Sequence, residues 1–227
     1  MKRYALYFAP ETDSAWWQAG CQWLGRDAEA MRAVSQPAID GIDADTQRQL
    51  TRDARRYGFH ATLKAPFRLA EGCTEQELRL ALQSFCSQQA AIDIISPQVQ
   101  WMGNFLALRA AEHQQSLNDL AFACVRQFDG FRAPLNQDDM ARRQRHQLGP
   151  RQAALLQQWG YPYVDEEFRF HLTLSDTLDQ SLAAQRMHDA AVAYFTLTAP
   201  LRIQGIALFA ENQAGADFQL LARFAFS

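Results

Sequence analysis

The hydrophobic pattern of the chain changes period several times, which predicts a mixture of strands and helices. Short β-prone runs bounded by turn residues predict strands at 2–9, 57–69, 92–101, 105–108, 168–178, 201–209 and 218–226. Helices are predicted at 14–24, at 45–55, and after Thr74, which begins a capping box with Glu77. Apolar residues at helical spacing predict further helices around 117–128 and 183–194.

The second half of the chain repeats the order of the first half, because each reads strand, helix, strand, strand. We therefore expect the α+β class, with duplicated units forming two pseudo-symmetric lobes whose mainly antiparallel sheets face a central cleft. The whole chain, 1–227, is expected to form a single domain, with a mainly helical insert at about 112–163.

Two similar octapeptides open the repeated units: YGFHATLK at 57–64 and FRFHLTLS at 168–175. Side chains two positions apart on a strand point to the same side. One side of each octapeptide is therefore apolar, and the other side carries a histidine and a threonine. These pairs are His60 with Thr62, and His171 with Thr173.

Two histidines that face each other across a cleft suit phosphodiester chemistry. Such a reaction needs a base at one side of the phosphorus and an acid at the other. Histidine can fill both roles near neutral pH, and threonine hydroxyls can donate to phosphate oxygens. A lone His-x-Thr usually marks a packed histidine with a hydrogen-bonded partner, but two copies in matching context favour an acid and base pair.

Metal and cofactor sites are not expected. Threonine is a poor ligand for transition metals, and no HxH, HExxH or carboxylate cluster accompanies the histidines. The cysteines lack metal-binding spacing, and we expect reduced, mostly packed thiols at Cys21, Cys73, Cys86 and Cys124.

The composition, with 48% hydrophobic and 21% charged residues and a net charge of −3, is typical of a globular protein. Without a surplus of basic residues, the chain favours a small phosphorylated substrate over extended nucleic-acid binding. The first apolar run ends at Pro10 and is too short for a signal peptide or a membrane span. We expect a cytoplasmic protein without a membrane partner, and the oligomeric state stays open.

The strings HATL and HLTL resemble the paired motif of the 2H phosphoesterase superfamily, which includes bacterial RNA 2′,3′-cyclic phosphodiesterases and 2′-5′ RNA ligase-like proteins. RYGFHATLKAPFRLA and LNQDDMARRQRHQLGPRQAALLQQWGYPYVDEEFRFHLTL are similar to the branch associated with phosphonate-utilisation operons, so the resemblance covers nearly the whole chain. It implies a bilobal fold, metal-independent hydrolysis of a phosphoric diester, and catalytic roles for His60, Thr62, His171 and Thr173. For the branch, it implies a phosphorylated ribose 1,2-cyclic phosphate as substrate in phosphonate catabolism.

Other residues are candidates for binding the substrate, each with a plainer alternative. Lys64 and Arg169 continue the cleft-facing alternation, or are solvated charges at strand ends. The cluster ARRQRHQ, which contains Arg142 and Arg143, could bind a second phosphate or form a solvated helix face. Tyr161 and Tyr163 could stack on a sugar or base, or wedge the insert against a lobe.

Two other functions remain open. An RNA-end enzyme that opens 2′,3′-cyclic phosphates or joins 2′-5′ ends should have a basic funnel and salt-dependent binding. A non-catalytic sensor of nucleotides or sugar phosphates would have no need for two proton-transferring groups.

Overall fold

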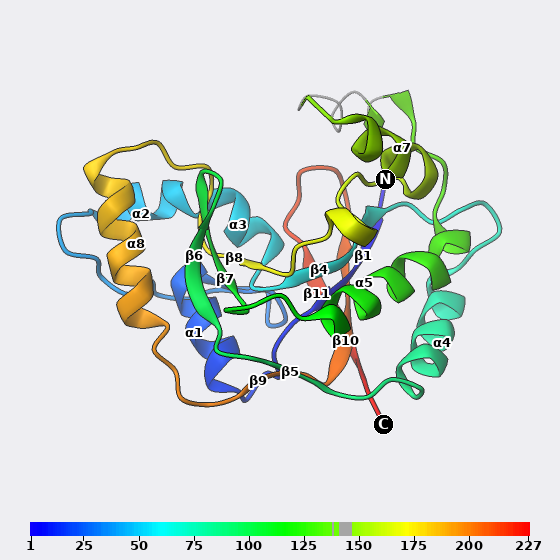
Figure 1. Ribbon diagram of the computed structural model, residues 1–227, viewed down its shortest axis with the longest axis horizontal. Coiled ribbons are helices and arrows are strands. Elements are labelled where there is room, and N and C mark those ends of the chain that lie inside the picture. The colour runs from blue at the N-terminus through cyan, green and yellow to red at the C-terminus, as the bar shows by residue number, and fades with distance from the viewer. Residues whose placement is uncertain (138, 141–146) are drawn as a thin grey trace.

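The computed structural model describes residues 1–137, 139–140 and 147–227, and it confirms the α+β class. Seven antiparallel strands form the main sheet in the order β11-β10-β1-β4-β8-β7-β6, and two small sheets pair β2 with β3 and β5 with β9 (Figure 1). The strands are β1 (Arg3–Phe8), β2 (Arg26–Asp27), β3 (Arg32–Ala33), β4 (Ala61–Phe67), β5 (Ile92–Ile94), β6 (Gln98–Met102), β7 (Phe105–Arg109), β8 (Leu172–Thr173), β9 (Leu201–Ile203), β10 (Gly205–Glu211) and β11 (Gln219–Ala225).

The helices of the described residues form two groups in Figure 1, with α1, α2, α3 and α8 on the left of the view and α4, α5 and α7 on the right. They are α1 (Ala15–Leu24), α2 (Ala44–Leu50), α3 (Arg52–Tyr57), α4 (Glu75–Cys86), α5 (Gln115–Gln127), α7 (Pro150–Trp159) and α8 (Leu182–Tyr194). Helices α5 and α7 fall within the predicted insert. None of the helices described is long and apolar enough to cross a membrane.

Local sequence signals explain where several helices begin and end. The predicted capping box is present at α4, where Thr74 Oγ1 accepts the amide of Glu77 and Glu77 accepts the amide of Thr74. The helix predicted at 45–55 is divided into α2 and α3. Thr51 interrupts it because its hydroxyl donates to the Gln47 carbonyl over 3.0 Å, a bond that competes with regular helix geometry.

The two halves of the chain exchange their hairpins. The hairpin β6–β7 from the first half lies next to β8, whereas β10–β11 from the second half lies next to β1, beside β4 (Figure 1). Helix α4 contacts β10 and β11, and α8 contacts β6. The two connections meet in the small sheet, where Ile92 pairs with Ile203 and Ile94 pairs with Leu201. As a result, the two octapeptides lie on neighbouring central segments.

Both octapeptide strands are shorter than predicted. Helix α3 continues to Tyr57, and β4 begins only at Ala61. Strand β8 is confined to Leu172–Thr173 within the predicted 168–178. Its ladder ends because the Leu106 amide donates to the Ser175 hydroxyl over 2.9 Å, where a regular ladder would use a backbone carbonyl.

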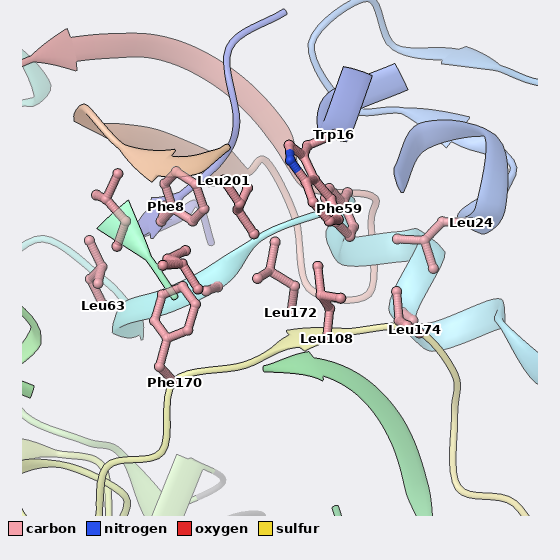
Figure 2. Close-up of a cluster of buried hydrophobic side chains, with 14 of the residues drawn as sticks. Phe8, Trp16, Leu24, Phe59, Leu63, Leu108, Phe170, Leu172, Leu174 and Leu201 are labelled. Atoms are coloured by element: carbon pink, nitrogen blue, oxygen red, sulfur yellow. The ribbon is translucent and has the colours of Figure 1, made fainter. Parts of the chain in front are cut away.

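The apolar side of each octapeptide faces the main core, as the alternation predicts. Phe59 and Leu63 from the first, and Leu172 and Leu174 from the second, pack with Leu108 in this core (Figure 2). Each such side chain stabilises the fold by roughly 1.5–3 kcal/mol through burial. The core thereby fixes the direction of the opposite, polar side. All four cysteines are free thiols, in agreement with the sequence.

Candidate active site

The polar sides of the two octapeptides meet in one cleft. His60, Thr62, His171 and Thr173 all line the same cavity of about 570 Å³. Ala61 of β4 pairs with Leu172 of β8 in antiparallel register. In such a ladder the residues that flank this pair lie across from each other on the opposite side, so that each histidine is opposite the threonine of the other motif.

Both imidazoles are oriented by equivalent hydrogen bonds. Nδ1 of His60 donates to the Gly58 carbonyl over 2.9 Å, and Nδ1 of His171 donates to the Arg169 carbonyl over 2.7 Å. A carbonyl oxygen can only accept, so the proton of each neutral ring is on Nδ1. Each ring is left with a lone pair on Nε2, the atom that can take up or deliver a proton.

The first histidine is further held by its neighbours. The Thr62 hydroxyl lies 3.3 Å from His60 Nε2, within reach to donate to it. The ring of Tyr7, which is opposite Thr62 in the pairing of β1 with β4, stacks on His60 at a centroid distance of 3.8 Å. Phe105 of β7 lies beside His171, with ring centroids 5.7 Å apart. These contacts restrict the motion of both rings.

Electrostatics favours the neutral form of both histidines. Burial lowers the pKa of His60 to about 4, although the bond to Gly58 opposes the shift, and the charge of a protonated His171 lowers this pKa further. Burial also lowers the pKa of His171, against its bond to Arg169 and together with the charge of Arg109. Because each ring disfavours a second proton nearby, the pair is suited to share one proton.

Lys64 does not line the cavity that contains the histidines. Strand β4 carries an extra residue between Thr62 and Lys64 relative to β1, and this β-bulge breaks the alternation that predicted a cleft-facing lysine. Its Nζ donates to the Val125 carbonyl and to Asp129, at 3.1 and 3.2 Å. Burial lowers the pKa of this amine to about 8, although Asp129 opposes the shift. The expected cleft-facing position of Lys64 is therefore wrong, and its predicted role in binding substrate phosphate stays a prediction.

The remaining predicted binding residues lie around a second part of the cleft. A cavity of about 470 Å³ shares Thr62 and His171 with the first one and is also lined by Arg169, Tyr161 and Tyr163. The Arg169 guanidinium donates to the carbonyls of Glu166 and Phe168. Arg142 and Arg143 lie outside the described residues, so their predicted role stays a prediction.

Several cleft residues were missed by the sequence reasoning. Tyr7, Arg3, Arg56 and Ser175 line the cavity that contains the two histidines. Arg3 and Tyr7 lie four positions apart on β1 and hence on one side of that strand, so a period of two could have linked them. Both sides of β1 are mostly buried. Its sequence pattern therefore did not indicate which side faces the cleft.

Over the ranges that the structure describes, no group of three or more histidine, cysteine, aspartate or glutamate side chains could hold a metal ion. The site consists instead of two imidazoles, two hydroxyls and flanking guanidiniums around a cavity.

The fold and the cleft define an α+β protein with paired His-x-Thr motifs on adjacent segments of one antiparallel sheet. The family model described as "Protein of unknown function (DUF1045)" matches residues 62–219, and the chain belongs to this family.

Two curated relatives are both named "Ribose 1,5-bisphosphate phosphokinase PhnN". The protein from Janthinobacterium sp. (strain Marseille) is 44% identical over 236 residues, which cover 100% of this chain and 51% of that protein. The protein from Laribacter hongkongensis (strain HLHK9) is 38% identical over 220 residues, which cover 96% of this chain and 50% of that protein. The chain thus spans about half the length of the curated relatives it matches.

Solved structures of E. coli LigT are also similar to this chain. The complex with 3′-AMP is 16% identical and the complex with NADP+ is 15% identical. Each comparison covers 100% of this chain and 98% of the solved chain, with a TM-score of 0.45.

Proposed function

We propose that this chain is a metal-independent phosphodiesterase of the 2H phosphoesterase type, which opens a small, phosphorylated cyclic diester. The observation that carries this proposal is the matched orientation of two imidazoles in one cavity, each bound through Nδ1 to a carbonyl two residues earlier. A sensor of phosphates would need donors to the oxygens, but not two lone pairs on Nε2.

The proposed reaction is an in-line hydrolysis. One histidine takes a proton from water through Nε2 while the water oxygen forms a bond to phosphorus. The bond from phosphorus to the ring oxygen breaks, and the other histidine, protonated at Nε2, gives its proton to that oxygen. Thr62 and Thr173 donate to the non-bridging oxygens. The negative charge of these oxygens also favours the protonated state of the acid, which burial of the imidazole disfavours.

The substrate that we favour is a ribose 1,2-cyclic phosphate that carries a further phosphate at its 5-position. Opening the bond from phosphorus to the 2-oxygen leaves ribose 1,5-bisphosphate. That compound is in the name of both curated relatives. Since this chain matches about half of each relative, the phosphokinase name supports a shared metabolic setting rather than kinase activity of this chain.

A second candidate substrate is an RNA end with a 2′,3′-cyclic phosphate. One observation favours it: Phe105, Tyr161 and Tyr163 line the cavity next to His171, where aromatic rings could stack on a nucleobase. A ribose phosphate without a base would leave this part of the cleft to water. The two substrates therefore differ in which part of the cleft they would fill.

The decisive experiment is turnover of both cyclic phosphates in the presence of EDTA, for the wild type and for the His60→Ala and His171→Ala variants. We expect turnover of the phosphorylated ribose cyclic phosphate with the chelator present. Each substitution should lower kcat by about 10²- to 10⁴-fold, the usual contribution of one positioned proton transfer. A wild type that binds the cyclic phosphates without turning over any of them would favour the sensor, and a loss of turnover on chelation would favour a metal enzyme.

A further inference from the structure

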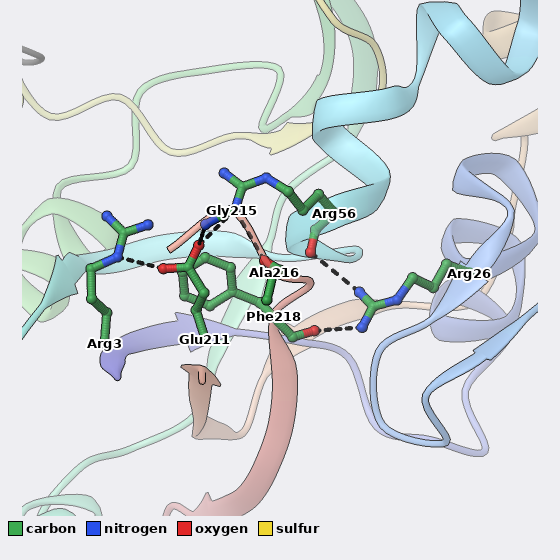
Figure 3. A network of polar contacts seen from close by, with 7 residues as sticks. All are labelled: Arg3, Arg26, Arg56, Glu211, Gly215, Ala216 and Phe218. Carbon is green, nitrogen blue, oxygen red and sulfur yellow. Dashed lines mark hydrogen bonds and ion pairs between the residues drawn. The ribbon is translucent and has the colours of Figure 1, made fainter. Parts of the chain in front are cut away.

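The end of the cleft near His60 has two arginines that share one buried carboxylate. Arg3 Nε donates to Glu211 over 2.5 Å, and Arg56 Nη1 donates to the other oxygen of Glu211 over 2.9 Å (Figure 3). The Glu211 side chain is fully buried, whereas those of Arg3 and Arg56 are 12% and 23% exposed. Both arginines line the cavity that contains His60 and His171.

The surrounding groups hold the two guanidiniums rigidly. The ring of Phe218 lies 5.9 Å from the guanidinium carbon of Arg3 and 5.8 Å from that of Arg56. Arg56 also lies over the ring of Tyr57 at 4.2 Å. The amide of Gly215 is a third donor to Glu211. This residue has a φ of +85°, a conformation that favours glycine, so the chain is shaped to bring its amide to the carboxylate.

The hydrogen bonds that hold the arginines leave donors for a ligand. Arg3 uses Nε for Glu211, and Arg56 uses Nη1 for both Glu211 and the Ala216 carbonyl. A guanidinium has five N–H donors, so each retains further donors of the kind that match phosphate oxygens.

The charges of this group do not cancel. Burial opposes ionisation of Glu211, but the bond and charge of Arg3, with the Gly215 amide and the charge of Arg56, keep its pKa lowered. Two cations thus face one anion. Asp53 and Asp176 also line the cavity, and the Asp176 carboxylate is occupied by the amides of Asp53 and Ala54.

We propose that Arg3 and Arg56 form a subsite for a phosphomonoester group of the substrate, separate from the diester at the histidines. This inference rests on the proposed function for the reaction at the histidines, and it specifies the substrate class as a cyclic diester with a second, terminal phosphate. Glu211 is a positioning residue, because it holds both guanidiniums at the wall of the cavity.

The subsite can be tested without turnover, by calorimetric binding of ribose 5-phosphate and of ribose to the full chain. The first compound has the terminal phosphate and lacks the cyclic diester. We expect ribose 5-phosphate to bind and ribose to bind much more weakly. Arg3→Gln and Arg56→Gln should each weaken binding of ribose 5-phosphate by about 10- to 100-fold, the usual effect of losing a charged hydrogen bond.

Arg79→Gln is the matched control, because Arg79 also pairs with a glutamate, Glu75, but does not line the cleft. It should bind ribose 5-phosphate like the wild type. If Arg56→Gln melts at a lower temperature than the Arg79→Gln control, Arg56→Lys replaces Arg56→Gln in the binding test. That variant keeps the charge next to Glu211 while losing the planar fork, so it should bind less tightly than the wild type.

Two results would overturn the subsite: equal affinity of the wild type for ribose 5-phosphate and ribose, or binding that depends on His171 and is unchanged by both arginine substitutions. Failure of the proposed function looks different. In that case ribose 5-phosphate would bind in an arginine-dependent manner, but no cyclic phosphate would be turned over.

Discussion

At the scale of single residues, the two imidazoles differ from ordinary surface histidines because they line one partly buried cavity. Their Nδ1 atoms are bound to backbone carbonyls, and burial lowers both pKa values. The balance between burial and neighbouring charge therefore sets the pH at which each ring is protonated. Both the proposed activity and the folding stability should depend on pH for this reason.

The first prediction concerns the pH dependence of folding stability. The pKa of His60 is about 4 in the folded chain, below the usual value near 6.5. Between these two pH values the unfolded chain binds more protons than the folded chain. Lowering the pH therefore stabilises the unfolded state relative to the folded state. The contribution of neutral His60 to the free energy of unfolding is fully present above pH 6.5 and is lost as the pH falls toward 4. By pH 5 the free energy of unfolding should have fallen by on the order of 2 kcal/mol.

The measurement is urea unfolding of the wild type and of His60→Gln from pH 7.5 to pH 4.5. Carboxylates titrate in both proteins, so the difference between the two curves isolates His60. We expect the wild type to lose more stability than the variant over this range. Parallel curves would contradict the lowered pKa.

The second prediction concerns the pH profile of kcat/KM, which reports groups of the free enzyme. The base must be neutral before substrate binds, and both histidines have lowered pKa values. The acid limb of the profile should therefore lie below pH 6.5 on the proposed substrate. Replacing either histidine should remove one limb from the profile. An acid limb at or above pH 7 in the wild type would be incompatible with this electrostatic environment.

At the scale of elements, the shape of the cleft depends on short strands whose ends are set by side chains. The Ser175 hydroxyl accepts the Leu106 amide and donates to the Asp176 carbonyl, each over 2.9 Å. It thereby fixes the chain just after β8, and Ser175 itself lines the histidine cavity. One buried hydroxyl determines where the second motif leaves the sheet.

Ser175→Ala should destabilise the protein by about 1–3 kcal/mol, because the Leu106 amide would be buried without an acceptor. Urea unfolding at pH 7.5 measures this loss. Ser84→Ala, an exposed change on α4, is the control and should remain within about 0.5 kcal/mol of the wild type. Equal stability of the two variants would show that the hydroxyl does not hold this segment.

The sequence predicted where helices and strands form better than which of them lie next to each other. The capping box before α4 and the apolar alternation of the octapeptides are local signals, and the structure contains both. The β-bulge that turns Lys64 away arises from the pairing of β4 with β1, which one strand's alternation does not include. The cluster of Arg3, Arg56 and Glu211 joins β1, α3 and β10, so no local pattern could indicate it.

At the scale of the whole molecule, the exchanged hairpins make each half depend on the other. The sequence pattern predicted a duplication. It could not predict which hairpin lies next to which half, because an apolar hairpin can cover either half equally well. In the structure, β4 lies between β1 and β8, and β8 lies between β4 and β7. The cleft that contains the two histidines is therefore built from segments of both halves of the chain.

The last prediction follows from this exchange and concerns fragments divided between Glu112 and His113, in an exposed loop before α5. Fragment 1–112 contains β6 and β7 but lacks their neighbour β8, and its β1 lacks β10. Fragment 113–227 lacks β1 and β4, which lie between its own strands β10 and β8 in the sheet. Each fragment alone would expose apolar faces and strand edges, so we expect neither to fold. Mixed in equal amounts, they should associate and recover protected amides in hydrogen exchange. A cooperative thermal transition of either fragment alone would mean that the halves are independent lobes and that the hairpin exchange is dispensable for folding.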